Sequence, residues 1–143
     1  MAYASRDDIE TLYSAEALHV ADRGGNAGET SAAISRALTQ ATDEIDSHLR
    51  VRYDTPITPV PWLLTQVCVD IALYRLANTA DVLSDEMRQR YEDAIKQLGN
   101  LASGKMRLAE VSAPGEPEKL DGPRPIVRTG PERLFTRAKT EGL

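Results

Sequence analysis

Hydrophobic residues recur at helical spacing through most of the first hundred positions. The longest such run covers residues 31–53, in which an apolar side chain returns every three or four residues: Ile34, Leu38, Ala41, Ile45, Leu49 and Tyr53. This spacing places them on one face of a helix. Three prolines within the following TPITPVP cannot continue a helix. The pattern therefore predicts a long amphipathic helix that ends near Asp54.

Two short helices are predicted before this one. Ser5 is a candidate N-cap for residues 6–13, with Asp7 and Asp8 near the positive end of the helix dipole. Ser14 can cap a second short helix over residues 15–22, in which Leu18 is the main apolar residue. The stretch RGGNAGET, residues 23–30, is typical of a loop.

Two further helices are predicted after the prolines. Residues 61–80 carry Pro61 in the first turn and are apolar over a broad face that includes Trp62, which indicates the central helix of a bundle. Residues 85–104 follow Ser84 as an N-cap and stop at Gly104. The stretch DVLSD separates the two helices.

The character of the chain changes after Leu108. Residues 109–143 contain five of the eight prolines and four of the nine glycines, without a lasting period. The short stretch KMRL, residues 105–108, resembles a strand. The predicted fold is all-α: a compact bundle of four to five helices over residues 1–108, followed by an extended C-terminal arm over residues 109–143.

The arm contains apolar residues that it cannot cover by itself. These anchors are Ile126, Val127, Leu134 and Phe135, the only phenylalanine in the chain. Ordering one residue costs about 1–2 kcal/mol of backbone entropy, whereas burying one large apolar side chain returns about 1.5–3 kcal/mol. Four anchors are too few to order the arm alone, so we expect it to take a fixed shape on a partner that supplies pockets and main-chain hydrogen bonds. A tail without function is the alternative.

Charge separates the body from the arm. Residues 1–104 hold 9 Lys and Arg against 16 Asp and Glu, a net charge of −7, whereas residues 105–143 hold 8 against 6, a net charge of +2. An acidic body argues against broad nucleic-acid binding, which needs clustered cations. A mildly basic tail on an acidic body instead suggests contacts between tail and body, within one subunit or between neighbours.

Neither composition nor motifs indicate a membrane span, a cofactor or a catalytic site. No apolar run is long enough to cross a bilayer, no secretory signal opens the chain, and the single Cys68 excludes an internal disulfide. RGGNAG lacks the flanking strand and the closing residues of a phosphate-binding loop. His19, His48 and Cys68 are too few and too widely spaced for a zinc site. We expect no enzymatic activity, no metal and no cofactor, and we expect Cys68 to be a small buried hydrophobic residue.

Several stretches in order resemble one family, the Mu-like phage neck proteins, which are head–tail connectors also called head-completion or adaptor proteins. The similarity runs through MAYASRDDIETLY, ALTQATDEIDSHLRVRY, the proline-rich TPITPVPWLL, DIALYRLAN and RQRYEDAIKQLGNLASGKMRL. An Arg-Tyr-x-x-Pro-hydrophobic step closes the long helix, and a Tyr-Glu-Asp-Ala segment follows later. The closing pattern matches at Pro131, Arg133, Leu134, Phe135, Thr136 and Arg137, and departs from Ala138 onward.

The resemblance implies that the protein has a structural role in the phage particle. It would be made in the host cytoplasm and located in the neck of the virion. It implies a homo-oligomeric ring, expected to be twelve-fold, beneath the portal protein and in contact with a tail-terminator or other neck protein. Genomic DNA would pass through the ring without specific binding, helped by carboxylates that repel phosphate. The predicted docking residues are those of the arm: Ile126, Val127, Arg133, Leu134, Phe135 and Arg137, with the two arginines pairing with acidic surface on a neighbour.

Two other function classes stay open from the sequence. One is a small cytoplasmic helical regulator that binds nucleic acid or a protein through its basic tail, which steep salt dependence of DNA binding would reveal. The other is a small hydrolase that uses Cys68 and a histidine, whose activity a change of Cys68 to Ser would remove.

Overall fold

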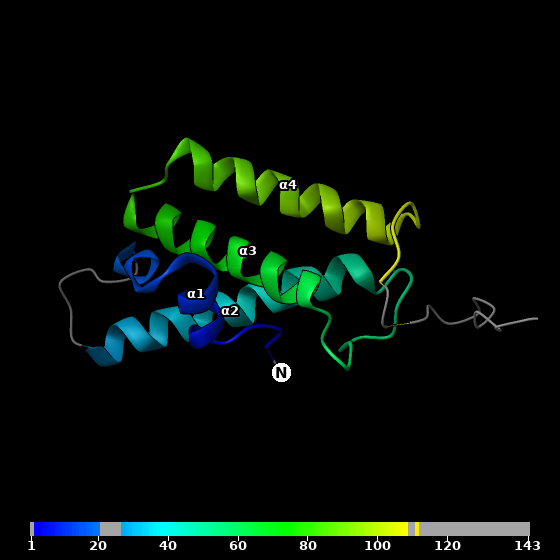
Figure 1. Ribbon diagram of the computed structural model, residues 1–143, viewed down its shortest axis with the longest axis horizontal. Coiled ribbons are helices and arrows are strands. Elements are labelled where there is room, and N and C mark those ends of the chain that lie inside the picture. Colours follow the sequence, from blue (N-terminus) through cyan, green and yellow to red (C-terminus); the bar gives the residue numbers. More distant parts are fainter. Residues whose placement is uncertain (1, 21–26, 109–110, 112–143) are drawn as a thin grey trace, which may run out of the picture.

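The computed structural model describes residues 2–20, 27–108 and 111, and it confirms the all-α prediction. Helix α1 (Arg6–Tyr13) is followed by a 3-10 helix, η1 (Ala15–Val20), and then by α2 (Ala27–Leu49), α3 (Trp62–Ala80) and α4 (Asp85–Ala102). Within the described residues there is no strand. The chain runs along α2, returns along α3 and runs out again along α4, as Figure 1 shows.

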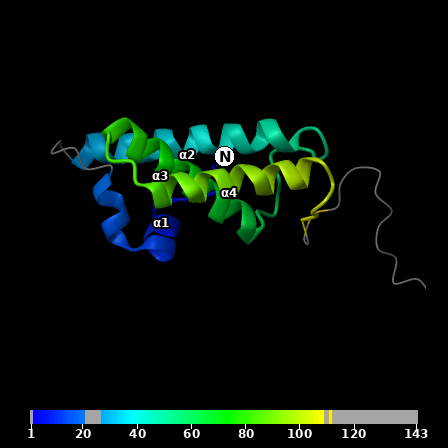
Figure 2. The same ribbon diagram turned by 90° about the horizontal axis from the view of Figure 1, so that it is seen from above.

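Helix α3 is the central element, as predicted. It packs against α2 on one side and α4 on the other, and α1 and η1 also contact it near one end (Figures 1 and 2). Its buried residues therefore occur around most of its circumference: Leu64, Thr65, Val67, Cys68, Val69, Ile71, Ala72, Leu73, Leu76 and Ala77. A helix that is apolar on all sides is stable only where neighbours surround it.

The flanking helices bury one stripe each. On α2 the buried residues are Ile34, Ala37, Leu38, Ala41, Thr42, Ile45 and Leu49, which includes most of the stripe predicted from the spacing. On α4 the buried residues are Ala94, Leu98 and Leu101. Amphipathic helices of this kind gain most of their stability from the buried face and little from intrinsic propensity.

Predicted helix caps at Ser5 and Ser84 are confirmed. The Ser5 hydroxyl accepts a hydrogen bond from the Asp8 N–H (3.3 Å), and the Asp8 carboxylate accepts one from the Ser5 N–H (2.7 Å), which completes a capping box. The Ser84 hydroxyl accepts from the Met87 N–H at 3.2 Å. Ser14 directly precedes η1, as predicted, and its carbonyl accepts a hydrogen bond from the Ala17 N–H at 3.2 Å. It also closes α1, with a φ of 70° and its N–H donating to the Glu10 carbonyl.

The predicted bounds of the long helix are displaced toward the N-terminus. Residues 27–30, expected in a loop, form the first turn of α2, where Glu29 lies near the positive end of the helix dipole. The helix ends at Leu49 and not near Asp54, because the N–H groups of Arg52 and Tyr53 both turn back to the Leu49 carbonyl. Tyr53 is still buried, at the start of the proline-rich connection.

Two further predictions about the helix ends are wrong. Pro61 is the N-cap of α3 and lies just before its first turn. Trp62, expected on the buried face, is 56% exposed because it opens the helix at the edge of the bundle.

The strand predicted for KMRL is also absent. The Met106 N–H donates to the Asn100 carbonyl at 3.1 Å, and the Leu108 N–H lies 3.5 Å from the Tyr53 hydroxyl. Leu108 is buried against the bundle. The stretch therefore folds back onto the end of α4, and no described segment lies beside it as a strand.

Gly104 makes this reversal possible. Its φ is 78°, a left-handed conformation that glycine adopts without strain. A Cβ placed there would also come within 1.8 Å of Nη1 of Arg52. The predicted stop of α4 at Gly104 is thus confirmed, with a close side-chain approach that the sequence did not indicate.

We expect Gly104→Ala to lower the free energy of unfolding by about 1–2 kcal/mol, because alanine must adopt the left-handed conformation and displace the Arg52 side chain. Gly99→Ala is the matched control. Gly99 lies inside α4, nothing lies within 4 Å of an added Cβ, and the change should raise stability by about 0.5–1 kcal/mol. Urea unfolding measures both, and equal effects of the two changes would contradict the assignment.

Candidate docking surfaces

The predicted docking residues lie outside the part of the chain that the structure describes. These are Ile126, Val127, Arg133, Leu134, Phe135 and Arg137, all within residues 112–143. Their roles and the boundary between body and arm remain predictions. The described residues show the surfaces that the helical body offers to partners.

Tyr3 fixes the N-terminal segment across three parts of the body. Its hydroxyl donates to the Asp46 carboxylate on α2 and accepts from the Ile57 N–H at 3.0 Å. Its main chain accepts from the Thr65 hydroxyl of α3 (3.1 Å) and donates to the Thr42 hydroxyl (3.2 Å). Asp46 is itself half-buried, and it holds a buried tyrosine although its position beside Ile45 on α2 gives no local sign of this role.

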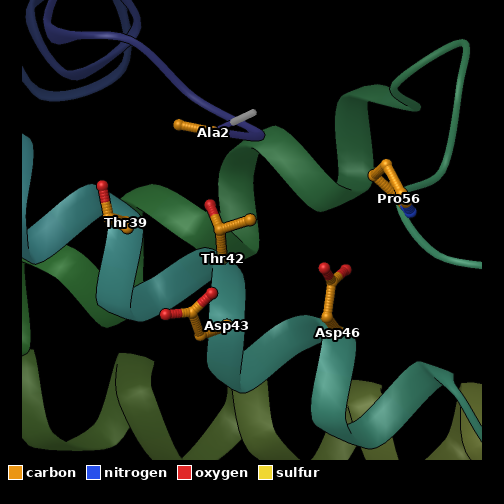
Figure 3. A pocket seen from close by; sticks show the side chains of 6 residues that line it. All are labelled: Ala2, Thr39, Thr42, Asp43, Asp46 and Pro56. Atoms are coloured by element: carbon orange, nitrogen blue, oxygen red, sulfur yellow. The ribbon is translucent and has the colours of Figure 1, made fainter.

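A hollow of about 350 Å³ opens beside this contact. Its lining comes from the N-terminal segment, α2 and the proline-rich connection: Ala2, Thr39, Thr42, Asp43, Asp46 and Pro56. Figure 3 shows Asp43 and Asp46 on successive turns of α2, with Pro56 on the connection opposite Asp46. The lining contains carboxylates, hydroxyls and small apolar groups, and it holds no general base paired with a nucleophile. The arrangement suits a positively charged or hydrogen-bonding group.

We expect Tyr3→Phe to lower the free energy of unfolding by about 1–3 kcal/mol, because it leaves the Ile57 N–H and the Asp46 carboxylate without the phenol. Burial and the hydrogen bond to Asp46 raise the pKa of Tyr3 from 10.0 to about 12. Because the pKa of Tyr3 is higher in the folded state than in the unfolded state, the protonated phenol stabilises the fold. This contribution is fully present below about pH 10 and is lost as the pH rises through about 12.

Chemical denaturation between pH 7 and pH 12 measures both effects. Tyr3→Phe should reduce the loss of stability on the alkaline side. Tyr74→Phe is the matched control. The Tyr74 ring stacks on Tyr91, and among the described residues the Tyr74 hydroxyl makes no hydrogen bond, so the change should alter stability by less than about 0.5 kcal/mol. If Tyr3→Phe and Tyr74→Phe changed the free energy of unfolding equally, the Tyr3 hydroxyl would not stabilise the fold through its hydrogen bonds.

A second tyrosine holds α1 to the bundle in the same way. The Tyr13 hydroxyl donates to the Asp70 carboxylate of α3 at 2.5 Å, and the Arg90 guanidinium lies 4.7 Å from the centre of the Tyr13 ring. Burial raises the pKa of Asp70 above its usual value, and burial together with this hydrogen bond raises the pKa of Tyr13 to about 12. The polar residue that interrupts the apolar run of α3 is therefore the partner of α1.

Glu44 connects all three long helices. Its carboxylate accepts from Nη2 of Arg75 on α3 (2.7 Å) and from the Tyr91 hydroxyl on α4 (3.0 Å). Tyr91 stacks on Tyr74 with ring centres 4.1 Å apart. Of the acidic cluster Asp43, Glu44 and Asp46, only Asp43 is exposed. Local spacing did not indicate these roles, because each partner lies dozens of residues away in the sequence.

Cys68 has the properties of a structural residue. It is fully buried in α3, and burial raises the pKa of its thiol to about 11. A thiol that stays protonated at neutral pH is a poor nucleophile. Within residues 2–20, 27–108 and 111, no three metal-ligating side chains come together, and no helix is long and apolar enough to cross a membrane. The expected buried position of Cys68 is confirmed.

Large hydrophobic side chains are exposed mainly at one end of the bundle. Among the described residues they are Val51 (80% exposed), Val82 (57%), Trp62 (56%) and Met106 (36%). Val51, Trp62 and Met106 belong to the half of the bundle where α2 ends, α3 begins and α4 ends. Val82 lies at the opposite end, between α3 and α4. Exposed apolar side chains at chain reversals are candidates for contact with other chains.

Comparisons with known proteins agree with the resemblance in the sequence. The model of the family described as Bacteriophage Mu, Gp36 matches residues 3–125. The "Mu-like prophage FluMu protein gp36" of Haemophilus influenzae is 35% identical over 107 residues, which are 74% of this chain and 74% of that protein. "Gene product J" of Escherichia phage Mu is 29% identical over 107 residues, 73% of this chain and 74% of that protein. The family match ends one residue before the first predicted anchor of the arm.

Proposed function

The chain belongs to the Bacteriophage Mu, Gp36 family, and from this membership we propose that it is a structural subunit of the virion neck. In this proposal several copies form a ring between portal and tail that completes the head, joins it to the tail and lets DNA pass. The observation that carries the proposal is the family match to phage proteins over residues 3–125. The fold adds support, because a compact helical body with surfaces at both ends suits an assembly subunit.

The chemistry of the body favours a structural role over an enzymatic one. Three polar side chains reach inward, and each holds a tyrosine or an arginine from another part of the chain: Asp46, Asp70 and Glu44. Cys68 is buried with a raised pKa. These groups stabilise the fold and leave no activated nucleophile among them, so we propose that the protein is not an enzyme.

Charge supports the passage of DNA without binding. Residues 1–104 carry a net charge of −7, from 16 acidic against 9 basic residues. Glu44 and Asp46 are used inside the fold, whereas Asp43 is exposed on α2. Exposed carboxylates of this kind would repel the phosphate backbone if they faced a channel. The same charge disfavours the alternative of a nucleic-acid-binding regulator.

The arm completes the proposed mechanism. We propose that Ile126, Val127, Leu134 and Phe135 become buried on a neighbouring chain, in the ring, the portal or a tail protein. In the same contact, Arg133 and Arg137 form charge-assisted hydrogen bonds with carboxylates on the surface of the neighbour, and such bonds are stronger than neutral ones. Binding to the neighbour compensates for the entropy of ordering the arm.

Particles produced by a phage that lacks this chain test the proposal. We expect DNA-filled heads and separate tails, with joining restored when the chain is supplied from a plasmid. A plasmid that carries Tyr74→Phe should restore joining equally well and controls for expression. Normal numbers of joined particles in the absence of the chain would contradict a role in the neck.

A further inference from the structure

The two ends of the helical body differ in charge. One end, here called the basic end, consists of residues 50–61 and 103–108, which follow α2 and α4. The other, here called the acidic end, consists of residues 80–86 between α3 and α4. Because α2, α3 and α4 run in alternating directions, these segments lie at opposite ends of the bundle, as Figures 1 and 2 show.

The basic end combines exposed cations with exposed apolar groups. It holds four basic residues against one acidic residue, Asp54: Arg50, Arg52, Lys105 and Arg107. Arg50, Lys105 and Arg107 are exposed. Val51, at 80% exposure, and Met106, at 36%, lie next to these cations in the sequence. Apolar groups rimmed by charge of one sign are typical of a surface that meets a partner of the opposite sign.

The acidic end has the matching composition. Residues 80–86 hold three acidic residues and no basic one: Asp81, Asp85 and Glu86. The Asp85 side chain is fully exposed and forms an ion pair with Arg88 at 4.0 Å, and Glu86 forms one with Arg90 at 2.5 Å. Exposed ion pairs on one helix are weak, so these carboxylates can exchange their partner for a cation of a second copy. Val82, at 57% exposure, lies among them. Each end therefore presents an exposed valine within a segment whose net charge is opposite in sign to that of the segment at the other end.

We propose that the basic end of one copy packs on the acidic end of the next copy, with Val51 facing Val82. This inference rests on the proposed ring and names the contact between its subunits. A second basic end is a poor partner for the basic end, because like charges would repel. The anchor-bearing segment, residues 124–139, is a poor partner for the same reason, since it holds five basic residues against one acidic residue. The acidic end of a second copy of the chain is the partner that offers both the opposite charge and an exposed apolar side chain.

The contact uses two different surfaces of the same chain. Such a contact repeats from copy to copy and closes into a ring when the rotation between copies permits. It needs no two-fold axis between neighbours, which fits a ring with many subunits. Opposite charges at the ends also speed the encounter of copies and set their direction.

Cysteine cross-linking of the full chain tests the contact. One full-length preparation carries Val51→Cys and a second carries Val82→Cys, and the buried Cys68 leaves a low background. When the two preparations are mixed under mild oxidation, we expect the disulfide between position 51 of one copy and position 82 of the other to form about tenfold faster or more than in a control mixture of Val51→Cys with Glu92→Cys. Glu92 is exposed on α4, away from both ends. Equal rates for the two pairs would overturn the inference.

Charge reversal provides an independent readout on the same protein. Adding Arg50→Glu and Lys105→Glu to the Val51→Cys chain should slow the mixed cross-link by about tenfold at low salt. Adding Asp85→Lys and Glu86→Lys to the partner chain should restore most of the rate. Thermal melting of each variant confirms that it is folded. No effect of reversal in folded variants would contradict the charge pairing.

The neck role and the end contact can fail separately. If cross-linking fails while particles still require the chain for joining, the neck proposal stands and its subunits meet through another face. If cross-linking succeeds while particles join without the chain, the end contact stands and the neck proposal falls.

Discussion

Ending the chain after residue 122 is expected to abolish the joining of filled heads to tails while leaving the helical body folded. The described core extends from Tyr3 to Leu108, so the change removes no residue of that core. It removes all four apolar anchors and both docking arginines. Each buried anchor is worth about 1.5–3 kcal/mol, and we therefore expect joined infectious particles to fall by roughly a hundredfold or more.

Counts of joined particles by electron microscopy, together with infectious titre, measure this effect. Circular dichroism of the purified 1–122 chain should show an unchanged melting curve. A chain that ends after residue 139 is the matched control, since it keeps Ile126 to Arg137 and should support normal joining. Normal joining by the 1–122 chain would show that the arm does not dock.

Ile45→Ala is expected to lower the free energy of unfolding by about 2–5 kcal/mol, the usual range for losing a buried branched side chain. Ile45 is fully buried on α2, the helix that packs most extensively on α3. Its neighbours Glu44 and Asp46 are held by Arg75, Tyr91 and Tyr3. These contacts restrict the shift of α2 that would close the cavity, which favours the upper part of the range.

Urea unfolding followed by circular dichroism measures this loss, which is large beside a total stability of about 5–15 kcal/mol for a domain. Gln40→Ala is the control, because Gln40 is exposed on the same helix and should change stability by less than about 0.5 kcal/mol. If Ile45→Ala costs no more than Gln40→Ala, α2 does not form the core contact described here.

Local patterns predicted the helices and several of their ends. The spacing of Ile34, Leu38, Ala41, Ile45 and Leu49 identified the buried face of α2, because period and burial are linked along one helix. Caps at Ser5 and Ser84 and the stop at Gly104 were also readable, since each depends on residues within a few positions.

The features that were missed depend on contacts between distant parts of the chain. The pair of Tyr3 with Asp46 and the pair of Tyr13 with Asp70 join residues 43 and 57 positions apart. Their carboxylates occupy positions that resemble a solvated flank or an interruption in an apolar run. The strand expected for KMRL failed because the left-handed turn at Gly104 returns the chain to the bundle. The arm lies outside the described residues, so its docking role is still a prediction.

Electron cryo-microscopy of the neck in joined particles would show where the chain lies. We predict a ring of helical bodies between portal and tail, with the basic end of each body on the acidic end of the next. In the same map Phe135 should be buried against a neighbouring chain. A neck that lacks these bodies, or Phe135 packed among the helices of its own subunit, would contradict the proposed assembly.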